Sequence, residues 1–180
     1  IQVSTKEICR SMSAPKQSDW VKLKRLARYL VKHPEIELVF DGFGLYDRIV
    51  VYVDADWAGC KKTRKSTSGG MVTLASTCLK TWSSTQGVVA LSSGESELYA
   101  VVKNAAEGIG VQSLMMDLGW QVSLVLRADS SAAKAILWRK GVGKVQHLDV
   151  RYLWGQQRLD EKLMRIEKVT GAVDPANNLT

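Results

Sequence analysis

Three acidic residues stand where elements of regular structure would present them to a common point. Asp54 directly follows the apolar run Ile49–Val53, and Asp129 ends the apolar stretch Ser123–Asp129. Glu97 precedes small or apolar residues by four, eight and eleven positions in a predicted helix, so it lies at the margin of the sheet-facing side. Converging carboxylates form the hard oxygen cage that Mg²⁺ or Mn²⁺ requires. We therefore predict a divalent-metal site at Asp54, Glu97 and Asp129.

Each of these acids also has a simpler explanation. Asp129 could cap a helix that begins at Ser130, Asp54 could begin a turn, and Glu97 could pair with a lysine. A carboxylate on a sheet-facing helix side is costly unless a positive group joins it. The three residues together therefore favour the metal site over the three separate explanations.

Apolar periodicity and capping signals predict the elements that position these acids. Ser92 and Glu95 form a capping box ahead of a helix that runs to about Gly108. The other predicted elements are strands at Arg48–Val53, Gly70–Ala75, Leu79–Ser84, Ser123–Asp129 and Leu163–Val169, and helices at Ser130–Arg139 and His147–Glu161. The short link between the second and third strands favours an antiparallel meander. This order predicts an α/β fold in which helices flank a mixed sheet.

The first 47 residues are predicted to form a separate segment. Ser18–Lys32 has an apolar stripe at helical spacing and basic residues largely outside it, which predicts a basic amphipathic helix. Its outer face is either solvated or a nucleic-acid contact. A short strand is predicted at Glu37–Phe40, and the turn-rich stretch Asp41–Asp47 is the best internal boundary. We therefore expect a linking segment at 1–47 and a folded domain at 48–180.

Composition restricts the partners and the compartment. The 180 residues carry a formal net charge of +7, which favours an anionic partner, nucleic acid first and a membrane surface second. No apolar run approaches the roughly 20 residues that span a bilayer, so we expect no membrane insertion. Cys9, Cys60 and Cys78 lack metal-site spacing and are interpreted as free thiols in a reducing compartment, without a disulfide-linked partner. The beginning IQVSTKEICR is typical of a piece of a longer chain.

Several sequence blocks resemble one known family. RKSTSGGMVTLAS, KTWSSTQGVVALSSGESELYA and HLDVRYLW are similar, in this order, to blocks of the ribonuclease H domain in the Pol polyprotein of copia-type LTR retrotransposons. The upstream stretch SMSAPKQSDWVKLKRLARYL resembles the segment that links reverse transcriptase to that domain. The resemblance implies the ribonuclease H-like fold, a five-stranded mixed sheet with flanking helices.

The resemblance also implies the roles of the acids. The family's first three catalytic acids fall on Asp54, Glu97 and Asp129, in agreement with the metal site predicted above. The fourth family acid, in the motif N-P-A-D, falls on Asn177, because this chain has DPANNLT. Asp174 falls on the initial Asn of that motif. The resemblance implies two Mg²⁺ ions, with Mn²⁺ as a substitute, and the neutral Asn177 predicts reduced activity.

The function that the resemblance implies is hydrolysis of the RNA strand of RNA–DNA hybrids, next to the reverse transcriptase of the same polyprotein. The expected location is intracellular, in a cytoplasmic particle, the nucleus or both. The alternative is a domesticated or weakened module that binds nucleic acid or has a structural role in a larger assembly. Hybrid contacts are predicted from a basic cluster and neighbouring hydroxyls, with a solvated hairpin loop as the alternative. These residues are Lys61, Lys62, Arg64, Lys65, Ser66, Thr67, Ser83 and Ser84.

Overall fold

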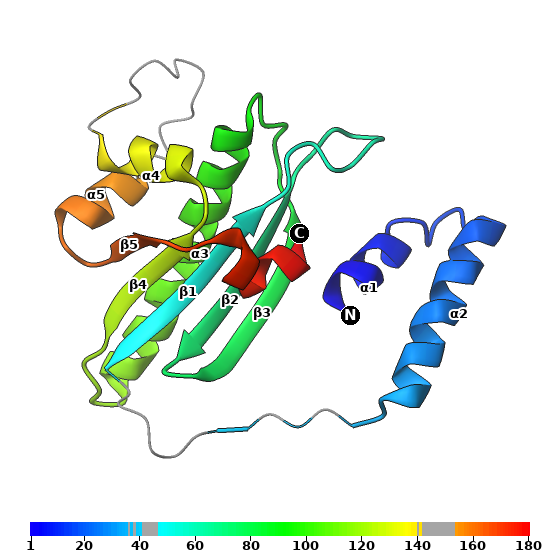
Figure 1. The fold of residues 1–180 in the computed structure, drawn as a ribbon, viewed down its shortest axis with the longest axis horizontal. Coiled ribbons are helices and arrows are strands. Elements are labelled where there is room, and N and C mark those ends of the chain that lie inside the picture. Colours follow the sequence, from blue (N-terminus) through cyan, green and yellow to red (C-terminus); the bar gives the residue numbers. More distant parts are fainter. Residues whose placement is uncertain (36, 38, 41–46, 140, 142–153) are drawn as a thin grey trace. The chain divides into compact units, whose positions relative to one another are not determined.

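Five strands form one mixed sheet in the order β3-β2-β1-β4-β5 (Figure 1). The strands are β1 (Arg48–Ala55), β2 (Thr67–Leu74), β3 (Thr77–Thr85), β4 (Ser123–Ala128) and β5 (Arg165–Lys168). The pairs β1–β2 and β2–β3 are antiparallel, whereas β1–β4 and β4–β5 are parallel. The predicted five-stranded mixed sheet and its antiparallel meander are confirmed.

The computed structural model describes residues 1–35, 37, 39–40, 47–139, 141 and 154–180. The chain divides into two compact units, Ile1–Val39 and Phe40–Thr180. The second unit holds the sheet, the helices α3 (Ser93–Asp117), α4 (Ser131–Trp138) and α5 (Trp154–Asp160), and the short 3-10 helices η2 (Gly171–Val173) and η3 (Pro175–Leu179). None of the helices among these residues has the length and apolar character needed to cross a membrane.

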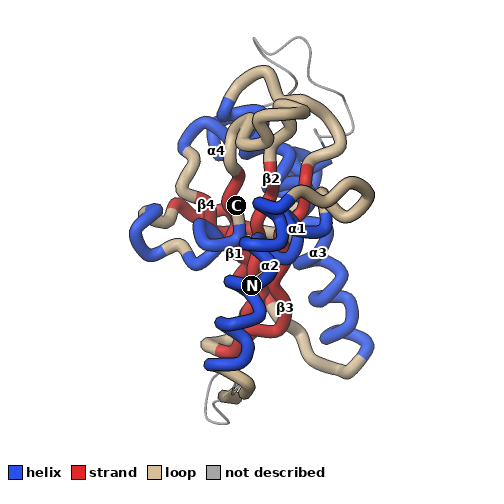
Figure 2. The backbone as a smooth tube through the Cα atoms, turned by 90° about the vertical axis from the view of Figure 1, so that its right-hand side faces the viewer, coloured by secondary structure: helices blue, strands red, loops and turns tan. Residues whose placement is uncertain are grey.

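Helix α3 covers one face of the sheet, and Figure 2 shows it running beside the strands. The helix lies directly on β1 and β4 at Gly108. A Cβ at that position would come within 2.8 Å of methyl carbons of both Val51 and Leu124. The apolar run of β1 explains this packing, because Val51 and Val53 are fully buried beneath the helix layer.

The opposite face of the sheet carries η3. Successive residues of a strand point to opposite faces, and two adjacent glycines of β2 show both layers. A Cβ on Gly70 would meet Asn104 of α3, whereas a Cβ on Gly69 would meet Leu179 and Thr180 of the η3 segment. Small residues in β2 therefore let both layers approach the sheet closely.

Several predicted boundaries are wrong. Helix α3 continues past Gly108 to Asp117, because Gly108 serves as a packing contact and does not end the helix. Strand β2 begins at Thr67, before the predicted Gly70. The strand predicted at Glu37–Phe40 is absent from its described residues 37, 39 and 40. In the last predicted helix, residues 147–153 lie outside the described residues, and α5 covers Trp154–Asp160.

The first unit contains α1 (Gln2–Cys9), which the sequence analysis missed, and α2 (Gln17–Lys32), which confirms the predicted amphipathic helix. Asp19 holds the start of α2, since its Oδ2 accepts a hydrogen bond from the Lys16 backbone N–H at 3.0 Å. The apolar stripe of α2 remains open within its unit, with Trp20 53% exposed and Val31 82% exposed.

Candidate active site

The structure brings Asp54, Glu97 and Asp129 together. One carboxylate oxygen from each residue lies within 4.8 Å of the other two. The parallel register explains the two aspartates: Val53 pairs with Ala128, so the residues that follow each of them reach the same edge of the sheet. Glu97 reaches this edge from the first turns of α3. The predicted convergence of the three carboxylates is confirmed.

The donor set fits a divalent cation. Carboxylate oxygens bind Mg²⁺ at about 2.1 Å, so two oxygens on opposite sides of one ion are roughly 4.2 Å apart. The oxygens of Asp54, Glu97 and Asp129 lie within 4.8 Å of one another, which is close to this separation. Three acidic oxygen ligands without sulfur or imidazole suit Mg²⁺ or Mn²⁺ better than a softer metal.

Burial and mutual repulsion make the site electrostatically unfavourable without a cation. Glu97 is 9% exposed, and its Oε2 is buried without a hydrogen-bond partner among the described residues. Burial, followed by the charges of Asp54 and Asp129, raises the pKa of Glu97 to about 8. Burial is also the largest cause of the raised pKa of Asp54, which the charge of Asp129 raises further. A bound cation would offset both effects.

The start of α3 is held by hydrogen bonds that fix the height of Glu97 above the sheet. Ser92 caps the helix, and its Oγ accepts a hydrogen bond from the Glu95 N–H at 3.2 Å. The Glu95 carboxylate in turn accepts from the Leu91 N–H at 2.7 Å and from the Tyr99 hydroxyl. Only half of the predicted capping box therefore forms: Ser92 caps the helix, whereas the Glu95 carboxylate accepts from the Leu91 N–H and not from the Ser92 N–H.

Gln86 is a positioning residue that the sequence analysis missed. Its Nε2 donates to Ser68 Oγ of β2 at 3.0 Å and to the Ser96 carbonyl of α3 at 2.8 Å. Ser96 immediately precedes Glu97, and Ser68 pairs with Ala55, the neighbour of Asp54. In the sequence, Gln86 is recognisable only as a glutamine two residues after the third predicted strand. The fold shows that it connects β2 to α3.

The C-terminal segment closes the site from the η3 side. Thr180 Oγ1 donates a hydrogen bond to Asp54 Oδ2 at 2.5 Å, a contact that the sequence analysis did not predict. Asn177 is exposed, and its side-chain amide donates to the Gly171 carbonyl. Asp174 is only 4% exposed and accepts from the Ala176 N–H at 2.8 Å. The segment thus places a neutral amide at its rim and a carboxylate in its interior.

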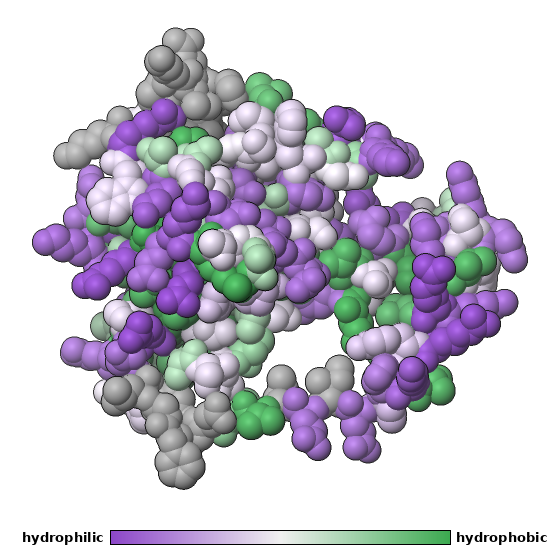
Figure 3. Space-filling model, viewed as in Figure 1, coloured by the Kyte–Doolittle hydropathy of each residue, from purple (hydrophilic) through white to green (hydrophobic). Residues whose placement is uncertain are grey.

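Most of the predicted nucleic-acid residues lie in the basic loop, residues 56–66 between β1 and β2. Lys61, Lys62 and Arg64 are exposed. Lys65 is partly buried, and its Nζ donates to the Gly87 carbonyl at 2.7 Å. Figure 3 shows hydrophilic residues at the tip of the loop. The loop therefore presents cations at the surface, as a phosphate-binding loop requires.

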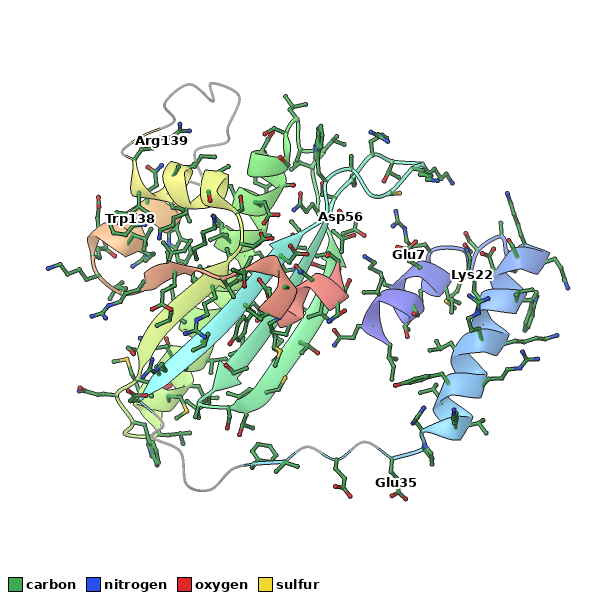
Figure 4. All side chains as sticks on the ribbon, viewed as in Figure 1. Glu7, Lys22, Glu35, Asp56, Trp138 and Arg139 are labelled. Atoms are coloured by element: carbon green, nitrogen blue, oxygen red, sulfur yellow. The ribbon has the colours of Figure 1, made fainter. Side chains whose placement is uncertain are left out.

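The structure does not support hydroxyl contacts from Ser66 and Thr67. Ser66 is fully buried, and its Oγ accepts from the Ala58 N–H at 3.0 Å, while Thr67 is 5% exposed. The Thr67 N–H donates to Asp56, labelled in Figure 4, where the loop leaves the sheet. These residues hold the base of the loop. Strand β2 begins three residues before its predicted start at Gly70, so Thr67 lies in the strand and Ser66 directly precedes it.

The two predicted serines of β3 have intermediate exposure. Ser84 Oγ accepts a hydrogen bond from Lys103 Nζ, which adds a cation from α3 next to this strand. Ser83 Oγ is buried and has no hydrogen-bond partner among the described residues. Their contact with nucleic acid stays a prediction.

Sequence comparison relates the chain to retrotransposon polyproteins. It is 30% identical over 179 residues to the Pol polyprotein of the transposon TNT 1-94 from Nicotiana tabacum, an alignment that covers 96% of this chain and 13% of that protein. It is 27% identical over 183 residues to the Pol polyprotein of the transposon RE2 from Arabidopsis thaliana, covering 12% of that protein. The chain thus spans about an eighth of these relatives. No family model matches it.

Structure comparison identifies the fold. The N-terminal RNase H domain of a Mycobacterium tuberculosis protein matches with a TM-score of 0.52 at 20% identity, covering 74% of this chain and 91% of that one. LC11-RNase H1, solved in complex with an RNA/DNA hybrid, matches with a TM-score of 0.50 at 14% identity, covering 73% and 93%. These likenesses show a shared fold for the unit that holds the three acids.

Proposed function

We propose that this chain, which has the ribonuclease H-like fold and is related to the C-terminal region of copia-type retrotransposon Pol polyproteins, is a metal-dependent endonuclease. Its proposed reaction is hydrolysis of the RNA strand of RNA–DNA hybrids. The observation that carries this proposal is the convergence of Asp54, Glu97 and Asp129 within 4.8 Å at one edge of the sheet. A related fold alone would leave the chemistry open, whereas this donor set supports metal-assisted hydrolysis of a phosphate diester.

The chemistry follows from the charge of the site. Bound Mg²⁺ ions supply Lewis acidity toward a phosphate diester and lower the pKa of an attacking water. Asp54 and Asp129 would hold the metal from adjacent strand ends, and Glu97 would hold it from α3. The Thr180 hydroxyl donates a hydrogen bond to Oδ2 of Asp54, and this contact restricts the orientation of the Asp54 carboxylate. The carboxylates fix the cations in place and transfer no proton themselves.

Hybrid recognition is proposed for the surface beside this site. The exposed Lys61, Lys62 and Arg64 present three positive charges on the basic loop, and Lys103 lies at Ser84 of β3. Cations recognise backbone phosphates without reading sequence, which suits an enzyme that acts on hybrids of any sequence. The RNA/DNA hybrid bound by LC11-RNase H1 supports this substrate class.

The proposed setting is a polyprotein that also contains reverse transcriptase, in a cytoplasmic particle, the nucleus or both. Such a neighbour would generate the RNA–DNA hybrid that the site consumes. The Ile1–Val39 unit is proposed as the link between them, because the alignment with the Nicotiana tabacum polyprotein covers 96% of this chain and so includes most of this unit.

The test is a cleavage assay on duplexes labelled separately in each strand. With Mg²⁺, the protein should cut the RNA strand of a hybrid and leave the DNA strand, single-stranded RNA and double-stranded DNA intact. Asp54→Asn should abolish cleavage. Glu107→Gln is a matched control on α3, because Glu107 pairs with Lys80 outside the acidic site.

The alternative function predicts a different result. The neutral Asn177, where the family pattern has an acid, favours a weakened or non-cutting module that binds nucleic acid. Folded protein that binds hybrid but cuts neither strand across Mg²⁺ and Mn²⁺ titrations would establish this alternative. Folded protein that neither binds nor cuts would remove both functions.

A further inference from the structure

The C-terminal segment contains a buried carboxylate with an unsatisfied oxygen. Asp174 is 4% exposed and precedes η3, where its Oδ1 accepts a hydrogen bond from the Ala176 N–H at 2.8 Å. Its Oδ2 is buried and has no hydrogen-bond partner among the described residues. A buried acceptor without a partner is costly, and a charged one more so. The observation requires an explanation other than local capping.

Asp174 lies close enough to the three acids to interact with their charges. Burial, followed by the charges of Asp54 and Asp129, raises the pKa of Asp174 to about 6. The interaction is mutual, since the charge of Asp174 also contributes to the raised pKa of Glu97. Four carboxylates in this region therefore repel one another.

The backbone holds Asp174 in this position. The η3 segment lies directly on Gly69 of β2, where a Cβ would come within 3.0 Å of the Ala176 carbonyl oxygen and within 2.9 Å of Thr180 Cγ2. Gly69 pairs with Asp54 across β1 and β2. The segment that carries Asp174 is thus fixed against the strand pair that carries the first acid.

Asn177 lies in the same C-terminal segment and is uncharged. Its Nδ2 donates to the Gly171 carbonyl, and a Cβ on Gly171 would lie 3.4 Å from that nitrogen and 3.2 Å from Asp129 Oδ2. The amide therefore lies near Asp129 but remains neutral. The sequence has D-P-A-N where the resemblance leads us to expect N-P-A-D, so the acid and the amide have exchanged places.

We propose that Asp174 supplies the fourth negative charge of the divalent-metal site, in place of the acid expected at position 177. This inference rests on the metal site of the proposed function. Asp174 acts on the cation through its charge and is not one of the ligands, because the group whose oxygens lie within 4.8 Å consists of Asp54, Glu97 and Asp129. Its unpaired oxygen attracts the cation and, in return, gains the positive neighbour that its burial requires.

The test measures Mg²⁺ binding directly, by isothermal titration calorimetry on the intact chain, with Mn²⁺ as a second probe. Asp174→Asn keeps one side-chain oxygen that can cap η3 and replaces the other, charged oxygen by a neutral NH2 group. It should weaken Mg²⁺ binding about tenfold or more, the order expected when one charge near a cation is lost from a partly buried site. Asp174→Asn/Asn177→Asp should restore most of the affinity. Asp160→Asn, at the exposed end of α5, is the matched control and should bind as the wild type does.

A second readout separates this role from a purely structural one. Without metal, Asp174→Asn should melt at a higher temperature than the wild type, because it removes a repelled, unsatisfied charge. With Mg²⁺, the wild type should gain more stability than the variant. A residue that only supported η3 would lose stability under both conditions.

The outcomes decide the inference independently of cleavage. Unchanged Mg²⁺ affinity in Asp174→Asn, or a wild type that binds no Mg²⁺, would overturn it. If the wild type binds Mg²⁺, Asp54→Asn and Asp174→Asn both weaken binding, and hybrid is still not cut, the inference stands while the proposed nuclease function fails.

Discussion

Replacement of Glu97 by glutamine gives a sharp test of the electrostatics, because this carboxyl is the most perturbed acid of the site. Its pKa lies at about 8, against an ordinary value of 4.5, and burial is the first cause. One pKa unit corresponds to about 1.4 kcal/mol. The shift therefore amounts to roughly 5 kcal/mol at most, a large part of the stability of an ordinary domain.

The sign of the effect follows from proton binding. The folded chain holds the Glu97 proton more tightly than the unfolded chain, so this residue favours folding most at pH values below its ordinary pKa. The contribution is lost as the pH rises from about 4.5 to about 8. Metal-free protein should therefore become less stable across this range. Glu97→Gln cannot ionise and should lose markedly less stability.

The assay is urea unfolding, followed by the fluorescence of the six tryptophans, in EDTA at a series of pH values. Glu107→Gln makes the same chemical change at another residue of α3, whose side chain is 36% exposed, and its stability should vary with pH as that of the wild type does. Saturating Mg²⁺ should reduce the wild-type loss, because the cation stabilises the ionised site. Parallel pH profiles for the wild type and Glu97→Gln would refute the reasoning.

Three further predictions concern the basic loop, Gly70 of β2, and Gln86. Replacement of the four cations of the basic loop, Lys61, Lys62, Arg64 and Lys65, by alanine should flatten the plot of log hybrid affinity against log salt concentration. The slope should change by about 0.9 for each phosphate that the protein no longer neutralises, and an unchanged slope would identify a solvated loop. Gly70→Ala should lower the urea midpoint strongly, since its Cβ would lie 1.9 Å from Asn104 Oδ1, whereas Gly87→Ala, with open space, should be near neutral. Gln86→Ala should cost about 1–3 kcal/mol by unfolding titration, because the Ser96 carbonyl loses its buried donor, and should reduce cleavage more than hybrid binding. An equal loss of binding and cleavage would contradict this positioning role.

The three acids could be predicted from the sequence because local pattern determines their placement. Apolar runs mark β1 and β4, and parallel neighbours end at the same edge, so Asp54 and Asp129 are adjacent once both strands are recognised. Ser92 marks the start of α3, which sets the position of Glu97 near the helix N-terminus. No long-range information beyond the pairing of two strands was needed.

The missed features depend on packing between distant segments. The burial of Ser66 and Thr67 follows from where β2 begins, and serine and threonine beside a cation run give no signal of that start. The full length of α3 depends on Gly108 lying against β1 and β4, a contact that turns an expected helix end into a helix interior. The burial of Asp174 depends on the docking of η3 onto β2.

The distribution of the site over four segments has a consequence for its stability. Strand pairing fixes Asp54 and Asp129, the α3 cap fixes Glu97, and the contact with Gly69 fixes the segment of Asp174. Repulsion among these groups is therefore opposed by the strand pairing, by the α3 cap and by the packing of η3 on Gly69. A bound cation would reduce this repulsion, so we expect metal binding to stabilise the fold. The weakest support is that of Asp174, held by a 3-10 segment of five residues, whereas β1 has strand partners on both sides. Disruption of the C-terminal segment should therefore lower metal affinity before it unfolds the sheet.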